Sequence, residues 1–156
     1  TFPFLSENVL DILLFTNPSS GCVHLFSYPE QSWAWTYNPI KASNRVINIL
    51  VQIDISNDNT KFGFTYSEFD ELIKLNKLKS LKNIKLKGMM GMASYTTDLS
   101  LIEREFNDLN NYFKKYKFNL ELDILSMGMS SDYEIAIKCN SNMIRLGSTI
   151  FGTRIK

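Results

Sequence analysis

The chain has 156 residues, 44% of them hydrophobic and 21% charged, which is enough for one globular domain with a buried core. Its formal net charge of +1 gives no support for a nucleic-acid or acidic-membrane partner. The apolar start, Phe2 to Phe15, carries two acidic residues and is too short to span a membrane. One histidine (His24) and two cysteines (Cys22, Cys139) form no metal-site or disulfide pattern, so a reduced, cytoplasmic setting is expected.

Residues 1–44 differ in composition from the rest of the chain, because all four prolines and both tryptophans lie there. After a candidate cap at Ser6, four apolar residues have the spacing of a short helix: Val9, Leu10, Leu13 and Leu14. No repeating strand–helix pattern follows, so we expect an irregular covering segment. A stacking platform made by Trp33 and Trp35 is the alternative for this segment.

A regular alternation of strands and helices begins near Arg45. Residues 46–55 (VINILVQIDI) form a nearly continuous apolar run, which is typical of a buried parallel strand. Further strands are expected at 84–90, 121–126 and 142–146, and helices at 67–80, 99–117 and 132–139. Ser67 is the expected cap of the first of these helices. This order predicts a parallel α/β sheet.

Two turns of small residues lie close together in the last third of the chain. Ser126, Gly128 and Ser130 follow one apolar run, and Gly147-Ser148-Thr149 follows the next. Such turns at the ends of neighbouring parallel strands favour a phosphate site, because glycine admits an anion to the backbone N–H groups and hydroxyls add donors. In (β/α)8 barrels, such a site commonly follows the last two strands. The alternative is a capping box at Ser131 to Glu134, which needs no ligand.

The same two turns carry a family resemblance. SMGMSSDYEIAI followed by IRLGSTIFGTR closely resembles the end of the pyridoxal-phosphate homeostasis proteins, the YggS/PROSC family. The resemblance covers about residues 45–156. It implies an α/β fold of the (β/α)8 TIM-barrel type, like the barrel of alanine racemase, with about the second half of the barrel at 45–156. Residues 1–44 are then a divergent or truncated N-terminal segment.

The resemblance also implies a ligand and its contacts. Family members bind pyridoxal 5′-phosphate (PLP), have no known turnover and serve intracellular PLP homeostasis. Their pattern implies no catalytic residue and no metal. Arg145 corresponds to the arginine that faces the pyridine nitrogen in the family. Its positive charge disfavours protonation of that nitrogen, because two cations in contact repel each other. An ion pair of this arginine with Asp132 or Glu134 is the alternative. Carried over residue by residue, the cofactor contacts are Ser126, Met129, Ser130, Arg145, Gly147 and Ser148.

The resemblance is lost in the first 44 residues. The family's first strand carries the lysine that binds PLP covalently, but here no lysine precedes Lys41. We therefore expect PLP to bind without a covalent bond. The open edges of a half barrel predict self-association. No nucleic-acid or membrane partner is expected. Two alternatives stay open: a racemase-like PLP barrel enzyme, and a partner-dependent half barrel with a vestigial phosphate cup.

Overall fold

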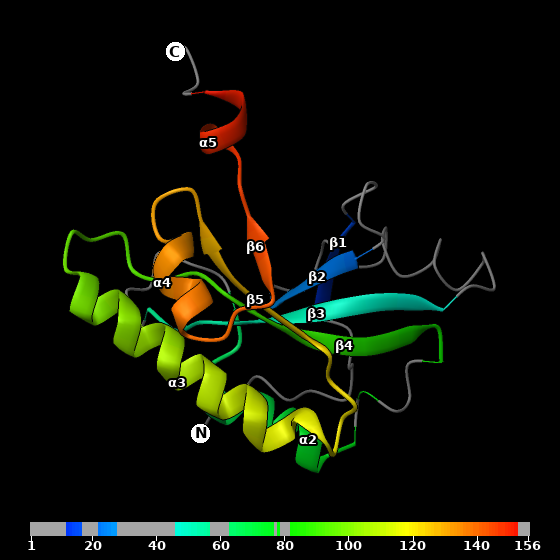
Figure 1. The fold of residues 1–156 in the computed structure, drawn as a ribbon. Coiled ribbons are helices and arrows are strands. Elements are labelled where there is room, and N and C mark those ends of the chain that lie inside the picture. The colour runs from blue at the N-terminus through cyan, green and yellow to red at the C-terminus, as the bar shows by residue number, and fades with distance from the viewer. Residues whose placement is uncertain are drawn as a thin grey trace.

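A computed structural model describes residues 12–16, 22–27, 46–56, 63–76, 78 and 82–152 of the chain (Figure 1). These residues form one six-stranded sheet in the order β1-β2-β3-β4-β5-β6. The strands are β1 (Ile12–Thr16), β2 (Cys22–Ser27), β3 (Ile47–Ile53), β4 (Ile84–Gly91), β5 (Ile124–Met129) and β6 (Met143–Arg145). The helices are α2 (Tyr66–Lys74), α3 (Leu99–Lys117), α4 (Tyr133–Lys138) and α5 (Ser148–Phe151).

The strands from β2 to β6 are all parallel to their neighbours. From β3 onward, strands alternate with helices, as the hydrophobic pattern predicts. β3 is buried from Ile49 through Ile53, because residues on both of its faces are covered. This half barrel of βα units confirms the α/β fold class and the parallel sheet.

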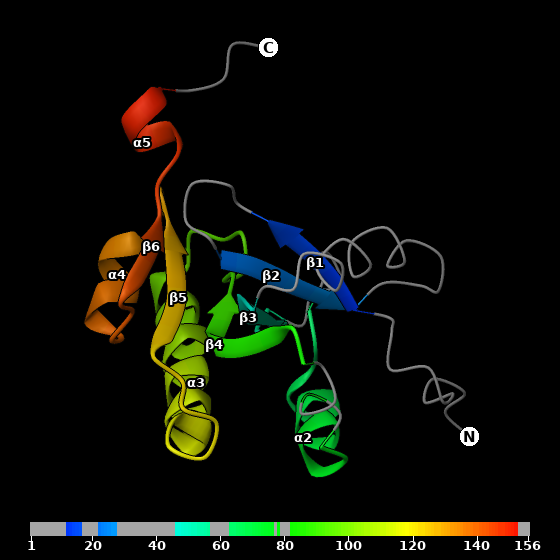
Figure 2. The same cartoon turned by 90° about the vertical axis from the view of Figure 1, so that its right-hand side faces the viewer.

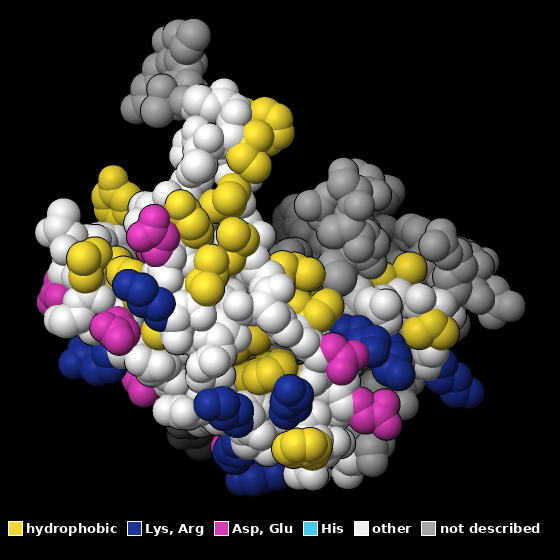
Figure 3. Space-filling model, viewed as in Figure 1, with side chains coloured by type: hydrophobic (Ala, Val, Ile, Leu, Met, Phe, Trp, Pro, Cys, Tyr) yellow, Lys and Arg dark blue, Asp and Glu magenta, His cyan; other side chains and the backbone are white. Residues whose placement is uncertain are grey.

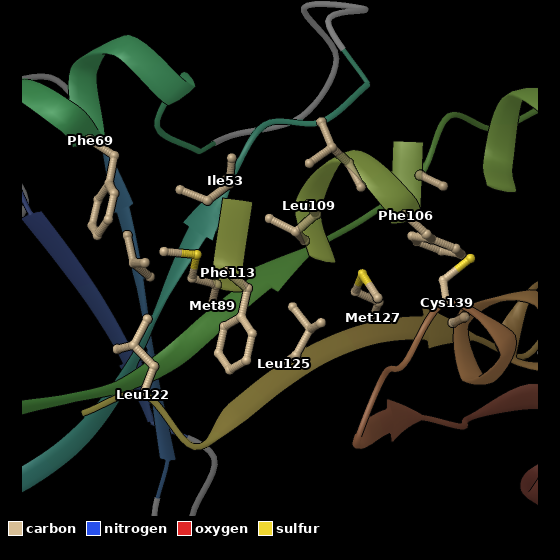
Figure 4. Close-up of a cluster of buried hydrophobic side chains, with 14 of the residues drawn as sticks. Ile53, Phe69, Met89, Phe106, Leu109, Phe113, Leu122, Leu125, Met127 and Cys139 are labelled. Atoms are coloured by element: carbon tan, nitrogen blue, oxygen red, sulfur yellow. The ribbon is translucent and has the colours of Figure 1, made fainter. Parts of the chain in front are cut away.

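One hydrophobic core joins the sheet to its helices. In the two ribbon views, α2, α3 and α4 lie on the same side of the sheet (Figures 1 and 2). The side chains of β3, β4 and β5 that point toward these helices meet their apolar faces in a cluster that includes Ile53, Phe69, Met89, Phe106, Leu109, Leu125 and Met127 (Figure 4). Each of these seven residues is at most 1% exposed, so the cluster is shielded from solvent like the core of an ordinary domain.

Side-chain caps define where the two longer helices begin. Thr65, rather than Ser67, caps α2 in a capping box with Glu68, so the expected cap was wrong by two residues. The helix also ends at Lys74 instead of extending to residue 80. Asp98 caps α3 by accepting hydrogen bonds from the N–H groups of Ser100 and Leu101, and the helix occupies 99–117 as predicted.

A polar cluster joins α2 to α3 on the outer surface. Asp70 accepts hydrogen bonds from the hydroxyls of Tyr112 and Tyr116 and pairs with the ammonium of Lys115. Burial raises the pKa of the Asp70 carboxyl, but the hydrogen bonds from Tyr112, Tyr116 and Lys115 outweigh burial and lower it to about 2. The Lys115 ammonium also lies over both tyrosine rings. The cluster therefore fixes the packing of α2 against α3.

Side chains help to attach β6 to β5. The register between these strands shifts between Ser126 and Met129. Just before β6, Ser141 Oγ lies within 3.2 Å of the carbonyl oxygens of Leu125, Met127 and Met143, and accepts from the N–H of Met127. Its neighbour Asn142 accepts from the N–H of Leu125 and donates to Asp123 O. These two side chains supply contacts where the backbone ladder is irregular.

The expectation of an irregular segment before residue 45 was wrong in part. β1 and β2 lie there, form an antiparallel pair, and extend the sheet beside β3. Leu13 and Leu14 belong to β1 and not to a helix. Ser6, Val9, Leu10, Trp33 and Trp35 lie outside the described residues. Whether residues 1–44 are a divergent or truncated segment stays a prediction.

Candidate functional site

The carboxyl ends of β4, β5 and β6 meet at one edge of the sheet. Gly91, Met129 and Arg145 are the last residues of these three strands. β5 extends to Met129, three residues beyond the end expected from sequence, so the small-residue turn begins at Ser130. In open and closed α/β sheets, ligands bind outside this edge.

Gly128 shapes the end of β5, just before the first turn. Its φ is +94°, a conformation that residues with a side chain rarely adopt. A Cβ there would lie 2.7 Å from the Cβ of Ala136 and 2.9 Å from the Cα of Tyr133, so α4 packs directly on this glycine. The turn is closed by the Asp132 carboxylate, whose Oδ1 accepts from the N–H of Met129 at 2.6 Å. The Ser131 capping box is not formed, because α4 starts after Asp132 without a side-chain cap.

Ser130 joins the first turn to the second. Its Oγ accepts hydrogen bonds from the N–H groups of Gly147 (3.2 Å) and Thr149 (3.3 Å). Because both lone pairs are occupied, the Ser130 hydroxyl proton is directed away from these amides and is available to a ligand. The N–H of Ser148 lies between them in sequence and makes no hydrogen bond within the described part of the chain. We call Ser130 and Gly147–Thr149 the phosphate cup.

The phosphate cup is open on the side of Gly147. A Cβ placed on Gly147 would have no atom within 4 Å, and residues 147–149 are all exposed. α5 follows and projects beyond the sheet in both ribbon views (Figures 1 and 2). Hydrophobic side chains gather over α4, β6 and α5 in the space-filling view (Figure 3). The exposed large hydrophobic residues of the two helices are Ile137 in α4 and Ile150 and Phe151 in α5.

Arg145, the last residue of β6, connects this strand to β5 and β4. Its Nη1 donates to the backbone oxygen of Ser126 (3.1 Å) and to Ser126 Oγ (2.7 Å), while its Nη2 donates to Gly91 O (3.1 Å). Burial lowers the pKa of Arg145, and the nearby Asp132 carboxylate partly offsets this. Arg145 makes no ion pair with Asp132 or Glu134 among the described residues, so the alternative raised from sequence is wrong.

The six predicted cofactor contacts fall into two groups and one outlier. Ser130 and Gly147 are hydrogen-bonded to each other, and Ser148 lies beside them. Arg145 and Ser126 form a second hydrogen-bonded pair. Met129 belongs to neither group. It is 37% exposed, but its backbone N–H already donates to Asp132 and is not available to a ligand.

Sequence reasoning missed two residues of this site. Gly91 acts through its backbone oxygen, which has no signature in the sequence. Asp132 acts as the acceptor that closes the turn, and its position three residues after Met129 was a usable signal, since an aspartate often bonds to a nearby backbone N–H.

Several hydrogen-bond donors of the site have no acceptor among the described residues. The Ser130 hydroxyl and the Ser148 N–H lie in the phosphate cup. The Arg145 guanidinium has five N–H groups, and within the described part of the chain it uses three of them, which leaves Nε–H and one Nη2–H. PLP presents phosphate oxygens and a ring nitrogen, all of which accept hydrogen bonds when unprotonated. The residues present therefore fit a phosphorylated pyridine.

Comparison with known proteins gives the family. Residues 26–155 match the family model described as "Alanine racemase, N-terminal domain". This chain belongs to that family. The match begins before residue 45, so the family resemblance extends further upstream than the motifs indicated.

Curated relatives of this family member are pyridoxal phosphate homeostasis proteins. That of Pasteurella multocida is 37% identical over 111 residues, 69% of this chain and 47% of the relative. That of Haemophilus influenzae is 33% identical over 135 residues, 78% of this chain and 56% of the relative. The chain therefore spans about half the length of these relatives, and the resemblance to the PLP homeostasis proteins is confirmed.

Solved structures support the same fold. PipY of Synechococcus elongatus PCC7942, determined with PLP bound, superposes with a TM-score of 0.66 at 21% identity over 85% of this chain and 61% of PipY. Alanine racemase of Clostridium difficile 630, in complex with cycloserine, gives 0.59 at 21% identity over 77% of this chain and 33% of the enzyme. The alanine racemase-like barrel predicted from sequence is thus confirmed as the fold. Within the described residues, no helix is both long and apolar enough to cross a membrane.

Proposed function

We propose that this chain binds PLP reversibly and without a covalent bond, and that it serves intracellular PLP homeostasis as a non-catalytic protein of the cytoplasm. The names of the curated relatives and the PLP-bound PipY structure support the ligand. The two cysteines, which form no disulfide pattern in the sequence, support the compartment. Cofactor contacts are proposed at Ser130, Gly147 and Ser148 for the phosphate and at Arg145 for the ring.

One observation carries the proposal. Ser130 Oγ accepts two converging backbone N–H groups, from Gly147 and Thr149, while its own proton stays free. This arrangement holds the two turns together before any ligand arrives, so the phosphate cup is preorganised and binding requires little ordering. A phosphate dianion would accept hydrogen bonds from the Ser130 O–H and the Ser148 N–H, and its negative charge would strengthen both bonds.

Arg145 suits a carrier better than a catalyst. When bound, PLP supplies an aldehyde that reacts with amines and a ring that withdraws electrons, most strongly when the ring nitrogen is protonated. A guanidinium facing that nitrogen repels the extra proton and keeps the nitrogen neutral. Burial of Arg145 strengthens this repulsion, because charges interact more strongly away from water.

The lysines of the described strands are poorly placed for a covalent bond to PLP. Lys85 and Lys87 lie in β4 and pair with Glu121 (3.6 Å) and Asp123 (2.7 Å). Both come before Gly88, whereas the phosphate cup lies beyond the carboxyl ends of β5 and β6. Lys61, the lysine just after the turn that follows the 46–55 run, lies outside the described residues.

A charge placed in the phosphate cup tests the proposal. Ser130→Asp keeps an oxygen acceptor for the Gly147 and Thr149 amides but adds a negative charge, whereas Ser130→Asn is the neutral control of similar shape. We expect the aspartate variant to lose at least about tenfold in PLP affinity, followed by absorbance titration, and to keep its affinity for pyridoxal, which lacks the phosphate. Unchanged PLP affinity in Ser130→Asp would show that the phosphate binds elsewhere. An amino-acid racemisation assay on the PLP-loaded chain distinguishes this carrier from a racemase-like enzyme.

A further inference from the structure

Ser126 is the most deeply buried hydroxyl of the candidate site. It lies in β5 and is 0% exposed. Its Oγ and its backbone oxygen both accept from Nη1 of Arg145, at 2.7 and 3.1 Å. The family pattern assigns this serine to the phosphate, whereas its contacts here are with the arginine.

Distance along β5 separates Ser126 from the phosphate cup. Ser130 lies four residues further on, and the strand alone, from Ser126 to Met129, spans roughly 10 Å at about 3.3 Å per residue. A phosphate held by Ser130 and the Ser148 N–H would therefore have to leave them to reach Ser126 Oγ. Ser126 is also 0% exposed, and its Oγ already accepts from the Arg145 guanidinium, so a phosphate would have to enter the buried part of β5 to reach it.

The Arg145 side chain turns back along the sheet to reach Ser126. In the β5–β6 register, Arg145 lies opposite Met129, three residues beyond Ser126. Gly91 O accepts from Nη2, so acceptors from two neighbouring strands hold both ends of the planar guanidinium. Gly91 packs directly against the core, because a Cβ there would lie 2.5 Å from Leu109 Cδ2. The three hydrogen bonds of Arg145 orient the planar guanidinium, and they therefore set the direction of its two remaining N–H groups.

We infer that Ser126 is a positioning residue for Arg145 and not a phosphate contact. The hydroxyl fixes the plane of the guanidinium, and the guanidinium then meets the ring of the ligand. The ligand half of this inference rests on the proposed PLP binding, whereas the Ser126–Arg145 half concerns the free protein and can be measured without any ligand.

Two serine-to-alanine variants, four residues apart in the chain, separate the roles. Ser126→Ala leaves one Nη1–H of the half-buried guanidinium without its acceptor, so Arg145 gains freedom. We expect PLP and pyridoxal to be weakened alike, by about threefold to tenfold, because both share the ring. Ser130→Ala removes a phosphate donor, so it should weaken PLP by about tenfold or more and leave pyridoxal unchanged.

Nitrogen-15 spectra of the arginine side chains give the readout that does not depend on a ligand. In the full chain, Arg145→Lys identifies the Arg145 signals by their loss. We expect resolved, slowly exchanging Nη protons for Arg145 in the wild type and in Ser130→Ala, and averaged, fast-exchanging ones in Ser126→Ala. Circular dichroism and the denaturation midpoint of each variant show whether it is folded, and Ser126→Thr, which keeps the hydroxyl, should restore the wild-type Arg145 signals.

Two results would overturn the inference. One is an Arg145 spectrum that Ser126→Ala leaves unchanged. The other is a Ser126→Ala variant that loses PLP affinity selectively over pyridoxal, as Ser130→Ala is expected to do. If the wild type binds no PLP at all, the proposed function fails, but the Arg145 spectra still decide whether Ser126 positions the arginine.

Discussion

Replacing Gly128 by alanine should be among the most damaging single-methyl changes available to this chain. The φ of +94° costs a residue with a side chain about 1–3 kcal/mol. The new Cβ would also lie 2.7 Å from Ala136 Cβ and 2.9 Å from Tyr133 Cα, so α4 has to move away from β5. Forcing a methyl group into a packed core costs about a further 1–3 kcal/mol.

The combined cost is roughly 2–6 kcal/mol, a large share of the free energy of unfolding of an ordinary domain, about 5–15 kcal/mol. Gly147→Ala is the matched control, because its φ is −122° and its Cβ would meet nothing within 4 Å. We expect the control to stay within about 0.5 kcal/mol of the wild type.

Urea denaturation followed by circular dichroism measures both variants. The midpoint of Gly128→Ala should fall well below that of the wild type with little change in slope, whereas the midpoint of Gly147→Ala should not move. Equal midpoints for the two variants would refute the close approach of α4 to β5. They would also refute the turn geometry on which the phosphate cup depends.

Three further predictions follow from contacts and edges already described. The pKa of Asp70 is about 2 in the folded chain, below the ordinary value of 3.8 expected for the unfolded chain. The ionised carboxylate therefore stabilises the fold above pH 4, and this contribution is lost as the pH falls from 4 to 2. With the side chain 29% exposed, solvent reduces the contribution to about 1 kcal/mol, and Asp70→Asn should remove this part of the pH dependence in denaturation midpoints. Borohydride treatment of the PLP-loaded chain, followed by peptide mass mapping, should label no lysine stoichiometrically, and one fully labelled lysine would contradict non-covalent binding. Since β1 and β6 are the edges of an open sheet and Ile150 and Phe151 are exposed, the isolated chain should self-associate, whereas a monodisperse monomer in light scattering would contradict this.

The regular part of the fold was predictable from hydrophobic pattern alone. The apolar run of β3 and the helical spacing of Ile102, Phe106, Leu109 and Phe113 in α3 have strong periodicities, and all four α3 residues are buried. β1 was mistaken for a helix because a short apolar run such as ILLFT fits both patterns, and its strand pairing depends on a distant segment.

The candidate site was predictable only where side chains carry the signal. Ser130 and Gly147 were identified from a motif, and the structure hydrogen-bonds them to each other. The contact of Ser126 with Arg145 could not be predicted, because it depends on an arginine side chain that turns back three residues along the neighbouring strand. Gly91 contributes a carbonyl oxygen, which every residue type has.

The attachment of β6 has a consequence for how the chain opens. Where the ladder to β5 is irregular, the Ser141 hydroxyl and the Asn142 amide supply bonds that a regular strand pair makes through its backbone. Such a strand can separate as a unit when these two side chains release, without unfolding β3 and β4. Amide hydrogen exchange should therefore show β6 and α5 exchanging together, well before the centre of the sheet. Since Arg145 belongs to β6, a ligand that binds Arg145 would slow that local opening and join the last segment of the chain to the cooperative core.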